Sequence, residues 1–466
     1  MKKGMVFTVL LLVLVFNFFS IPADAADRLE TENIKLNNEG IPDISEQEPN
    51  DSFDTANEIA LEDLVSGTMT AMNNDMYKIT IPRKGYLSIY GEVIERFTST
   101  IPRLNVVVYK ILPDGKKEPF YGGGISWDDE GGFYGGHIVE PGTYYLQIYD
   151  NEQRLQGERY TFSTELIETD VTRISGETRF ETAVQVAYEG WSDSGTDEIL
   201  LATGRNFPDA LAAGPLAYYK DAPILLTEKD SLPSAVINAI NDLGVKKVTI
   251  IGGTSAVSKE VEDYLRNLNL TIERIAGSDR YETAVEIAKK LPKSNTSIVV
   301  YSQNFPDALS ISSYAAAHGY PILLADTNSL KSVIKNQINN YQKTYVIGGR
   351  DVVSESVFNQ LPNPTRISGN NRYETSVNVA TYFYAPVNQP GMHYSFVTTG
   401  TNFADALTGS VLAAFYGQPI VLTPSDELHP LVKEMFKYQN VLWYTIIGGE
   451  SAVSQNIEDE IWSLIR

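Results

Sequence analysis

One sequence motif occurs three times in the C-terminal two thirds of the chain, and this repetition limits the possible folds more than any other feature. The motif reads Arg-Ile, a small residue, glycine, two variable residues, Arg, an aromatic residue and Glu-Thr. Its copies start at Arg173, Arg274 and Arg366. A second motif, Asn-Phe-Pro-Asp-Ala-Leu, follows each copy and recurs every 98 residues, with Ala404 in place of proline in the third copy. A unit of this length can bury a core of its own, so we expect three related domains in tandem.

Within the first copy, short apolar runs alternate with segments of helical spacing. Expected strands are 199–202, 223–227 and 248–251, and expected helices are 181–187, 206–213, 233–243 and a last one capped by Ser258. Strands that are apolar throughout are typical of a parallel sheet with helices on both faces. We therefore predict that each copy is a small Rossmann-like α/β parallel-sheet domain.

The stretch before residue 170 has a different pattern. Runs rich in β-branched and aromatic residues, such as 75–81, 85–90 and 143–149, are separated by glycine and proline turns. We predict an all-β sandwich or jelly-roll and a multidomain chain. The expected division is a signal peptide at 1–25, a leader or linker at 26–44, the β-sandwich at 45–169 and three repeats at 170–270, 271–363 and 364–466.

The N-terminus has the pattern of a secretory signal. Lys2 and Lys3 precede an apolar run over 5–19, and Ala23-Asp24-Ala25 fits a cleavage site. A short membrane anchor is the alternative, although about 15 apolar residues are fewer than the ~20 that a spanning helix needs. No later segment is apolar enough to span a membrane, and the C-terminus shows no anchoring tail, so we expect a secreted protein held non-covalently at the cell surface.

Composition excludes several classes of function. There is no cysteine, which rules out disulfides, thiolate metal sites and cysteine nucleophiles. The net charge of −22 argues against general nucleic-acid binding.

The repeated motifs resemble a known family. Arg-Ile-x-Gly-x-x-Arg-Tyr-Glu-Thr-Ala, Asn-Phe-Pro-Asp-Ala-Leu, Pro-Ile-Leu-Leu and Ile-Gly-Gly, three times in this order, are similar to the cell wall binding repeat 2 family of Gram-positive surface proteins and autolysins. The resemblance implies an intramolecular, pseudo-threefold trio of repeats that binds an anionic, teichoic-acid-like wall polymer. Residues 45–169 resemble the bacterial pre-peptidase C-terminal domain, a β-sandwich accessory module, which the repeats would display at the surface.

The arginines of the first motif are the main candidates for contact with such a polymer. Residues 171–466 contain ten arginines, and six of them belong to this motif. Guanidinium groups form directional, bidentate pairs with phosphate or carboxylate. The candidates are Arg179, Arg280 and Arg372, followed by Arg173, Arg274 and Arg366. Ion pairs with Glu181, Glu282 and Glu374, two residues after the second arginine, are an alternative that the sequence leaves open.

Two further sets of candidate binding residues lie where strands are expected to meet helix starts. This is the edge of an open α/β sheet at which ligands usually bind. The first set is Asn206, Asn304 and Asn402, which helix capping explains equally well. The second set is the glycine pairs 252–253, 348–349 and 448–449. Their amides could receive a phosphate, but a tight turn requires the same glycines.

Catalysis finds little support in the sequence. No histidine recurs through the three copies, and neither H-E-x-x-H nor G-x-S-x-G occurs. Asp128 and Asp129 could act as a glycosidase pair, although a solvated acidic loop explains them as well. We predict a non-enzymatic surface protein; the alternative is a cell-wall hydrolase or protease with its catalytic centre in the N-terminal region.

One metal site is expected near the start of the β-rich region. The candidate ligands are Glu46, Glu48, Asn50, Asp51 and Asp75. Clustered carboxylate and amide oxygens suit Ca²⁺, and the resemblance to collagenase pre-peptidase domains implies calcium at the Glu-x-Glu-x-Asn-Asp segment. The alternative is a disordered acidic leader. We expect no other cofactor.

Overall fold

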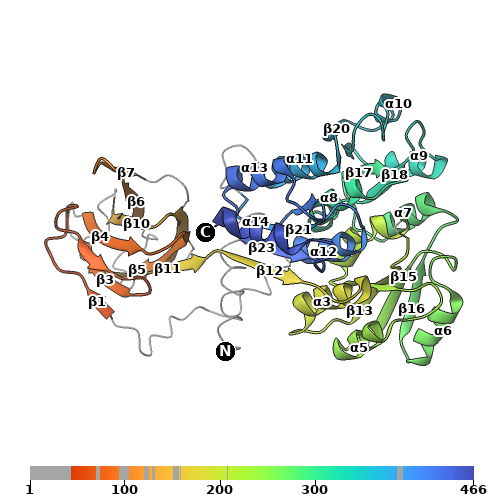
Figure 1. The fold of residues 1–466 in the computed structure, drawn as a ribbon, viewed down its shortest axis with the longest axis horizontal. Coiled ribbons are helices and arrows are strands. Elements are labelled where there is room, and N and C mark those ends of the chain that lie inside the picture. Colours follow the sequence, from red (N-terminus) through yellow and green to blue (C-terminus); the bar gives the residue numbers. More distant parts are fainter. Residues whose placement is uncertain are drawn as a thin grey trace. The chain divides into compact units, whose positions relative to one another are not determined.

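The computed structural model describes residues 43–69, 74–93, 104–119, 125–127, 132–150, 157, 159–206, 208–385 and 392–465. The expected signal peptide, almost all of the leader, and Asp128 and Asp129 lie outside the described residues. The chain divides into two units, with the boundary between Thr169 and Asp170 (Figure 1). Among the described helices, none has the length and apolar character needed to cross a bilayer.

The regular elements described in the first unit are all strands, which form two sheets. The six-stranded sheet has the order β1 (Asp43–Ser45), β3 (Leu64–Thr68), β11 (Arg159–Glu168), β5 (Gly85–Val93), β9 (Gly132–Val139) and β8 (Ile125–Trp127). The five-stranded sheet has the order β2 (Asn57–Ile59), β4 (Asn74–Ile81), β10 (Gly142–Tyr149), β6 (Asn105–Ile111) and β7 (Lys117–Pro119).

Both sheets contribute to one hydrophobic core. Leu87 and Ile89 of β5 lie in the same buried cluster as Ile79 of β4 and Leu146 of β10. Leu87 and Ile89 are two positions apart in β5, as expected where one face of a strand is buried. The prediction of a β-rich N-terminal region is therefore confirmed.

The second unit contains three four-stranded sheets, and all strand pairs within them are parallel. The first has the order β14 (Ile224–Thr227), β13 (Glu198–Thr203), β15 (Lys247–Ile251) and β16 (Thr271–Ile275). The second has β18 (Ile322–Ala325), β17 (Thr296–Tyr301), β19 (Lys343–Ile347) and β20 (Pro364–Ile367). The third has β22 (Ile420–Thr423), β21 (Tyr394–Thr399), β23 (Trp443–Ile447) and β12 (Asp170–Ile174). The prediction of parallel-sheet α/β repeats is confirmed.

The fourth strand of each sheet connects neighbouring copies. Strand β16 completes the first sheet and then leads into the second copy, and β20 does the same between the second and third copies. Strand β12 precedes the first copy but pairs with β23 of the third, with Val171 opposite Tyr444. The three copies are thus closed into a ring. The expected boundaries at 270/271 and 363/364 separate sequence copies, but each falls in front of a strand that belongs to the preceding sheet.

Helices follow the strands in each copy. In the first copy they are α3 (Arg179–Trp191), η1 (Ala210–Ala212), α4 (Gly214–Tyr219), α5 (Ser234–Asp242) and α6 (Lys259–Asn267). In the second they are α7 (Arg280–Ala288), α8 (Pro306–Ala317), α9 (Ser332–Ile338) and α10 (Glu355–Phe358). In the third they are α11 (Arg372–Tyr384), α12 (Ala404–Phe415), α13 (Pro430–Gln439) and α14 (Gln455–Ile465).

Helices α4, α8 and α12 pack against one another. Gly214, Ser312 and Ser410 hold the same place in their copies, and they meet at this contact. A Cβ atom on Gly214 would lie 3.3 Å from Ser410 Oγ and 3.8 Å from Ser312 Cβ. Small residues at this position allow the three helices to approach closely around a pseudo-threefold centre.

The prediction of one helix over 206–213 is wrong for the first copy. A short 3₁₀ turn, η1, is followed there by the separate helix α4, whereas α8 and α12 are single helices in the other copies. Pro215 gives the physical reason, because proline has no amide hydrogen and its ring collides with the carbonyl of the preceding turn. The corresponding residues, Ser313 and Val411, allow a continuous helix.

Candidate functional site

The first arginine of each motif is bound within the fold. Arg274 donates from Nε and Nη2 to Glu262 Oε2 at 2.9 and 2.7 Å, and from Nη1 to the carbonyls of Gly252 and Val257. Arg173 makes the same set of contacts to Glu458, Gly448 and Val453. Both arginine side chains are about five-sixths buried, at 17% and 16% exposure.

The third of these arginines has a related environment. Arg366 Nη1 donates to the carbonyl of Gly348 at 2.8 Å, and its guanidinium lies 4.8 Å from the ring centre of Phe358. Its Nη2 lies 3.5 Å from Glu355 Oε1. The first arginines therefore support the glycine turns and the following helices, and we leave them out of the candidate site, contrary to the sequence analysis.

The glycine pairs are explained by their turns. Gly252, Gly348 and Gly448 have φ values of +105°, +120° and +121°, a region that favours glycine. Each also contacts an aspartate: a Cβ atom on Gly348 would lie 2.7 Å from Asp307 Oδ2. The Gly348 amide already donates to the carbonyl of Ile367 at 3.0 Å, and the other two glycines make the equivalent bond. These three amides are therefore not available to a phosphate.

The second arginine of each motif presents more of its donors. Arg179 Nη1 donates to the carbonyl of Gly204 at 2.7 Å, just beyond the end of β13. Arg280 and Arg372 bond in the same way to the carbonyls of Ser302 and Gly400. All three residues are partly buried, in the same range as the first arginines of the motif. Among the described residues, no carboxylate lies within 4.0 Å of any of these three guanidinium groups.

The glutamates of the motif stabilise helix starts and do not pair with the second arginines. Glu181 Oε2 accepts from the amide of Thr178 at 2.8 Å in a capping box at the start of α3. Glu282 and Glu374 accept in the same way from Ser278 and Asn370. The alternative left open by the sequence, that these glutamates form ion pairs with the second arginines, is therefore wrong for the described residues. Each glutamate instead satisfies the first turn of its helix.

The second arginines lie at junctions between copies. The positive charge of Arg179 acts on Asp405 of the third copy, and that of Arg372 acts on Asp307 of the second. Burial raises the pKa of each aspartate to about 6, and the arginine opposes this rise. Each of these junctions thus combines an arginine from one copy with an aspartate and a glycine turn from the copy before it in the ring.

The candidate asparagines lie in the turns beside these junctions. Asn304 Oδ1 accepts from the amide of Phe305 at 3.0 Å, and Asn402 Oδ1 accepts from that of Ala404 at 3.4 Å. Asn206 is exposed in the corresponding turn. The first two side chains therefore form local turns or caps, whereas Asn206 is exposed.

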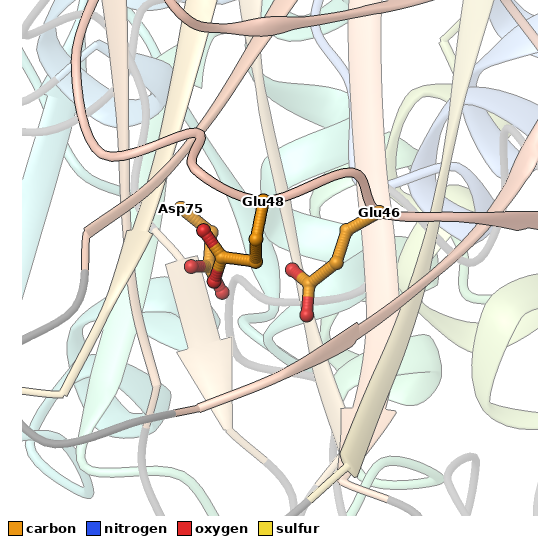
Figure 2. A group of neighbouring side chains, drawn as sticks. All are labelled: Glu46, Glu48 and Asp75. Atoms are coloured by element: carbon orange, nitrogen blue, oxygen red, sulfur yellow. The ribbon is translucent and has the colours of Figure 1, made fainter.

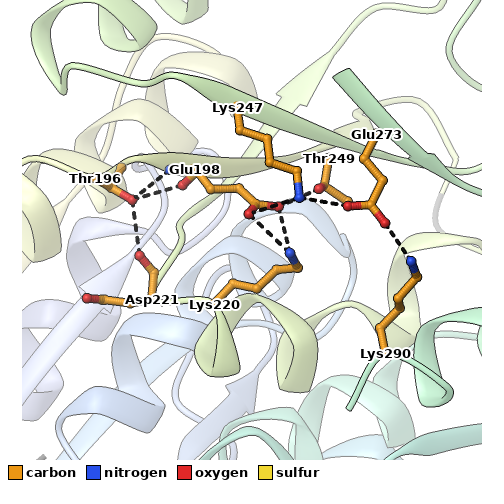
Figure 3. Close-up of polar contacts among 8 residues, drawn as sticks. All are labelled: Thr196, Glu198, Lys220, Asp221, Lys247, Thr249, Glu273 and Lys290. Atoms are coloured by element: carbon orange, nitrogen blue, oxygen red, sulfur yellow. Dashed lines mark hydrogen bonds and ion pairs between the residues drawn. The ribbon is translucent and has the colours of Figure 1, made fainter. Parts of the chain in front are cut away.

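A separate ionic cluster in the first copy is structural (Figure 3). Lys247 Nζ lies 2.7 Å from Glu273 Oε2 and 3.4 Å from Glu198 Oε2. Lys220 pairs with Glu198 at 2.9 Å, and Lys290, which follows α7, pairs with Glu273 at 2.7 Å. Hydrogen bonds from the two lysines lower the pKa of Glu273 to about 2. Because every lysine here is paired, the cluster ties the first sheet to the second copy rather than offering an anion site.

Three of the predicted calcium ligands come together in the β-rich unit. Glu46, Glu48 and Asp75 offer oxygen atoms that all lie within 4.8 Å of one another, and their side chains point to the same side (Figure 2). Asn50 is adjacent to this group, because its backbone amide donates to Glu48 Oε2 at 3.0 Å. Asp51 is exposed and outside this group.

The environment of this cluster fits a cation. Asn50 and Asp75 are fully buried, and Oδ1 of each has no hydrogen-bond partner among the described residues. Asp75 Oδ2 accepts from the hydroxyl of Tyr160 at 2.5 Å. Burial, together with the charges of Glu46, Glu48 and Asp51, raises the pKa of Asp75 to about 8. A buried carboxylate such as that of Asp75, which neighbouring carboxylates repel, is stabilised when a cation binds between them.

Comparison with known proteins places the ring in a family. The sequence model of Cell wall binding domain 2 matches residues 173–262, 274–358 and 366–458, which is more than half of the chain. The chain therefore belongs to this family, and the resemblance stated above is confirmed. The match also shows a protein of the cell wall or cell surface.

Individual relatives agree with this assignment. The chain is 33% identical over 300 residues to the N-acetylmuramoyl-L-alanine amidase LytC of Bacillus subtilis, covering 64% of this chain and 59% of the amidase. It is 32% identical over 295 residues to the amidase enhancer of the same organism, covering 62% of this chain and 40% of that protein. The structure of Cwp8 from Clostridium difficile is similar with a TM-score of 0.59 and 35% identity, covering 64% of this chain and 52% of Cwp8. The chain thus spans about half the length of these relatives. The likeness of residues 45–169 to pre-peptidase C-terminal domains stays a prediction.

Proposed function

We propose that the ring retains a secreted protein in a Gram-positive cell wall by binding an anionic, teichoic-acid-like polymer at the junctions between copies. The observation that carries the proposal is the state of Arg179, Arg280 and Arg372. Each guanidinium uses one N–H group on a backbone carbonyl, with no carboxylate of the described residues within 4.0 Å. The remaining N–H groups suit a phosphate, which guanidinium binds in a directional, bidentate way.

The ring geometry supports retention by several weak contacts. The three arginines occupy the same position in three copies of one closed unit, so one long polymer chain can reach more than one junction. Linked sites act at a high effective concentration, which raises the overall affinity well above that of a single contact. At physiological salt, charges beyond about 8 Å are largely screened, so the nearby arginines outweigh the distant acidic surface.

We propose a binding protein without enzymatic activity. The chain has none of the catalytic motifs considered above, and the β-rich unit would be the part displayed from the wall. One relative is an amidase and another an amidase enhancer, which makes a hydrolase the natural alternative. Its suggested pair, Asp128 and Asp129, lies outside the described residues.

Co-sedimentation with purified walls tests both parts of this proposal. We expect the full chain to sediment with intact walls and to stay in solution with walls stripped of phosphate polymers. We also expect no soluble wall fragments after prolonged incubation. Equal sedimentation with both preparations would overturn the polymer assignment, and release of fragments that is lost on changing Asp128 or Asp129 would favour the hydrolase.

We also propose that Glu46, Glu48, Asn50 and Asp75 bind calcium in the β-rich unit. The support is the pair of buried oxygens without partners beside clustered carboxylates, because Ca²⁺ takes six to eight oxygen ligands. The expected role is structural: the ion would fix the segment after β1 against β4.

Calcium is expected to raise the melting temperature of the β-rich unit in the full chain. Binding to the folded state alone stabilises it by about 2.7 kcal/mol when calcium is present at a hundredfold its Kd. Calorimetric titration and thermal unfolding should show the effect in the unchanged chain and a loss of it in Asp75→Asn. Glu58→Gln, an exposed change outside the cluster, is the matched control. An equal response of all three proteins would contradict the site.

A further inference from the structure

The three junctions differ in the residues that follow their strands, and one of these positions carries a carboxylate in only two copies. In the first copy, Glu228 follows β14 and pairs with Arg205, whose Nε lies 2.7 Å from Glu228 Oε2. The corresponding residue after β18 is Asp326, which accepts hydrogen bonds from the hydroxyls of Tyr281 and Ser302. After β22 in the third copy, this position holds Pro424. A carboxylate thus stands at the first two places and none at the third.

The first of these carboxylates lies close to its junction arginine, and the second is linked to its arginine through Ser302. Glu228 is near enough to Arg179 for the arginine's charge to contribute to lowering the Glu228 pKa, after the larger effect of Arg205. Asp326 contacts Ser302, whose carbonyl accepts from Arg280 at 2.7 Å. A negative charge at this position competes with a phosphate for the guanidinium and repels it.

The third junction has hydroxyl groups instead. Arg372 donates to the carbonyl of Gly400, which stands between Thr399 and Thr401. The Thr399 hydroxyl lies 2.8 Å from that of Thr401 and 3.3 Å from that of Ser425. Hydroxyl groups can donate to a phosphate oxygen without opposing its charge. The Arg372 junction contains the buried Asp307, and the Arg179 junction contains the buried Asp405. A buried aspartate therefore does not distinguish the third junction from the first.

We infer that the junction formed by Arg372, Thr401 and Ser425 is the strongest of the three anion subsites and takes a phosphodiester group of the polymer. The inference rests on the proposed function and deepens it, because it assigns unequal roles to sites that the repeat makes equivalent. The first two junctions hold the same polymer more weakly, since Glu228 and Asp326 stand beside their arginines.

Single substitutions in the full chain test this ranking. The probe is a synthetic glycerol-phosphate oligomer, titrated by calorimetry at low salt against Arg179→Gln, Arg280→Gln and Arg372→Gln. We expect Arg372→Gln to weaken binding about tenfold and each of the others less than threefold. Equal losses, or a larger loss at Arg179 or Arg280, would overturn the inference while leaving polymer binding intact. If the unchanged chain does not bind the oligomer, the proposed function fails as well.

Charge exchange at the distinguishing position gives an independent check. Pro424→Glu should weaken oligomer binding, whereas Asp326→Asn, which keeps an oxygen for Tyr281, should strengthen it about threefold. Asp263→Asn, an exposed change on α6, controls for the change in net charge. Equal changes in affinity for Asp326→Asn and Asp263→Asn would show that only the net charge matters, and the proposed effect of Asp326 at its junction would be wrong. Thermal unfolding of each variant separates a loss of fold from a loss of binding.

Discussion

Arg179→Gln, Arg280→Gln and Arg372→Gln combined in one chain should reduce its sedimentation with purified walls at least tenfold. Each change removes a positive charge and the N–H groups that face the junction. One charge-assisted hydrogen bond contributes about 1.5–3 kcal/mol, and 1.4 kcal/mol already corresponds to a factor of ten. The cost to folding should be smaller, because each arginine makes only one described hydrogen bond to the backbone, typically about 1 kcal/mol.

A matched variant separates local contact from overall charge. Lys246, Arg266 and Arg350 are exposed and outside the set of junction arginines, and changing all three to glutamine removes the same total charge. We expect this control to sediment almost as the unchanged chain does. If it loses wall binding as severely as the junction variant, the interaction is a general charge effect and the junction site is wrong. Far-UV circular dichroism confirms that both variants are folded.

Removing strand β12 should destabilise the ring strongly. A chain that starts at Ser175 lacks the pairing of β12 with β23, and Glu458 loses its buried partner Arg173. Breaking a buried ion pair by removing one partner costs about 3–5 kcal/mol. Strand β23 would also become an exposed edge, which favours aggregation. We expect the melting temperature to fall by about 5–10 °C.

The matched control starts at Asp170 and lacks only the β-rich unit. Since β12 is kept, its melting transition should coincide with that of the ring in the full chain. Differential scanning calorimetry of the two shortened chains at equal concentration measures the difference. Coinciding transitions for both shortened chains would show that β12 does not close the ring in solution.

The repeat pattern made much of the fold predictable. Short strands without polar interruption, such as Ile224–Thr227, can be stable only in a sheet covered on both faces, and the structure has them in parallel sheets. Pro306 lies in the first turn of α8, a position that proline favours, whereas the corresponding Pro208 lies in a turn before the short 3₁₀ helix η1. The first copy departs from this pattern because Pro215 interrupts its central helix.

The calcium cluster was predictable in part. Glu46, Glu48 and Asn50 are close in sequence, so their proximity follows from local chain geometry. The position of Asp75 on β4 beside these residues, and its contact with Tyr160 on β11, depend on strand pairing and sheet packing and could not be predicted from the sequence. Gly67 carried a signal that the sequence analysis missed: a Cβ atom there would lie 2.3 Å from the Tyr160 hydroxyl and 2.7 Å from Glu46 Oε2.

The sequence by itself determined that this chain carries three copies of a parallel α/β unit of the cell wall binding family after a β-rich region, because periodic burial and repeated motifs are local properties. Only the tertiary structure decided which arginines are available. Arg173 and Arg179 look alike in the motif, yet the first is held by Glu458 from the far end of the chain and the second faces a neighbouring copy. The roles of equivalent residues depend on long-range pairing such as that of β12 with β23, which repeated local motifs do not encode.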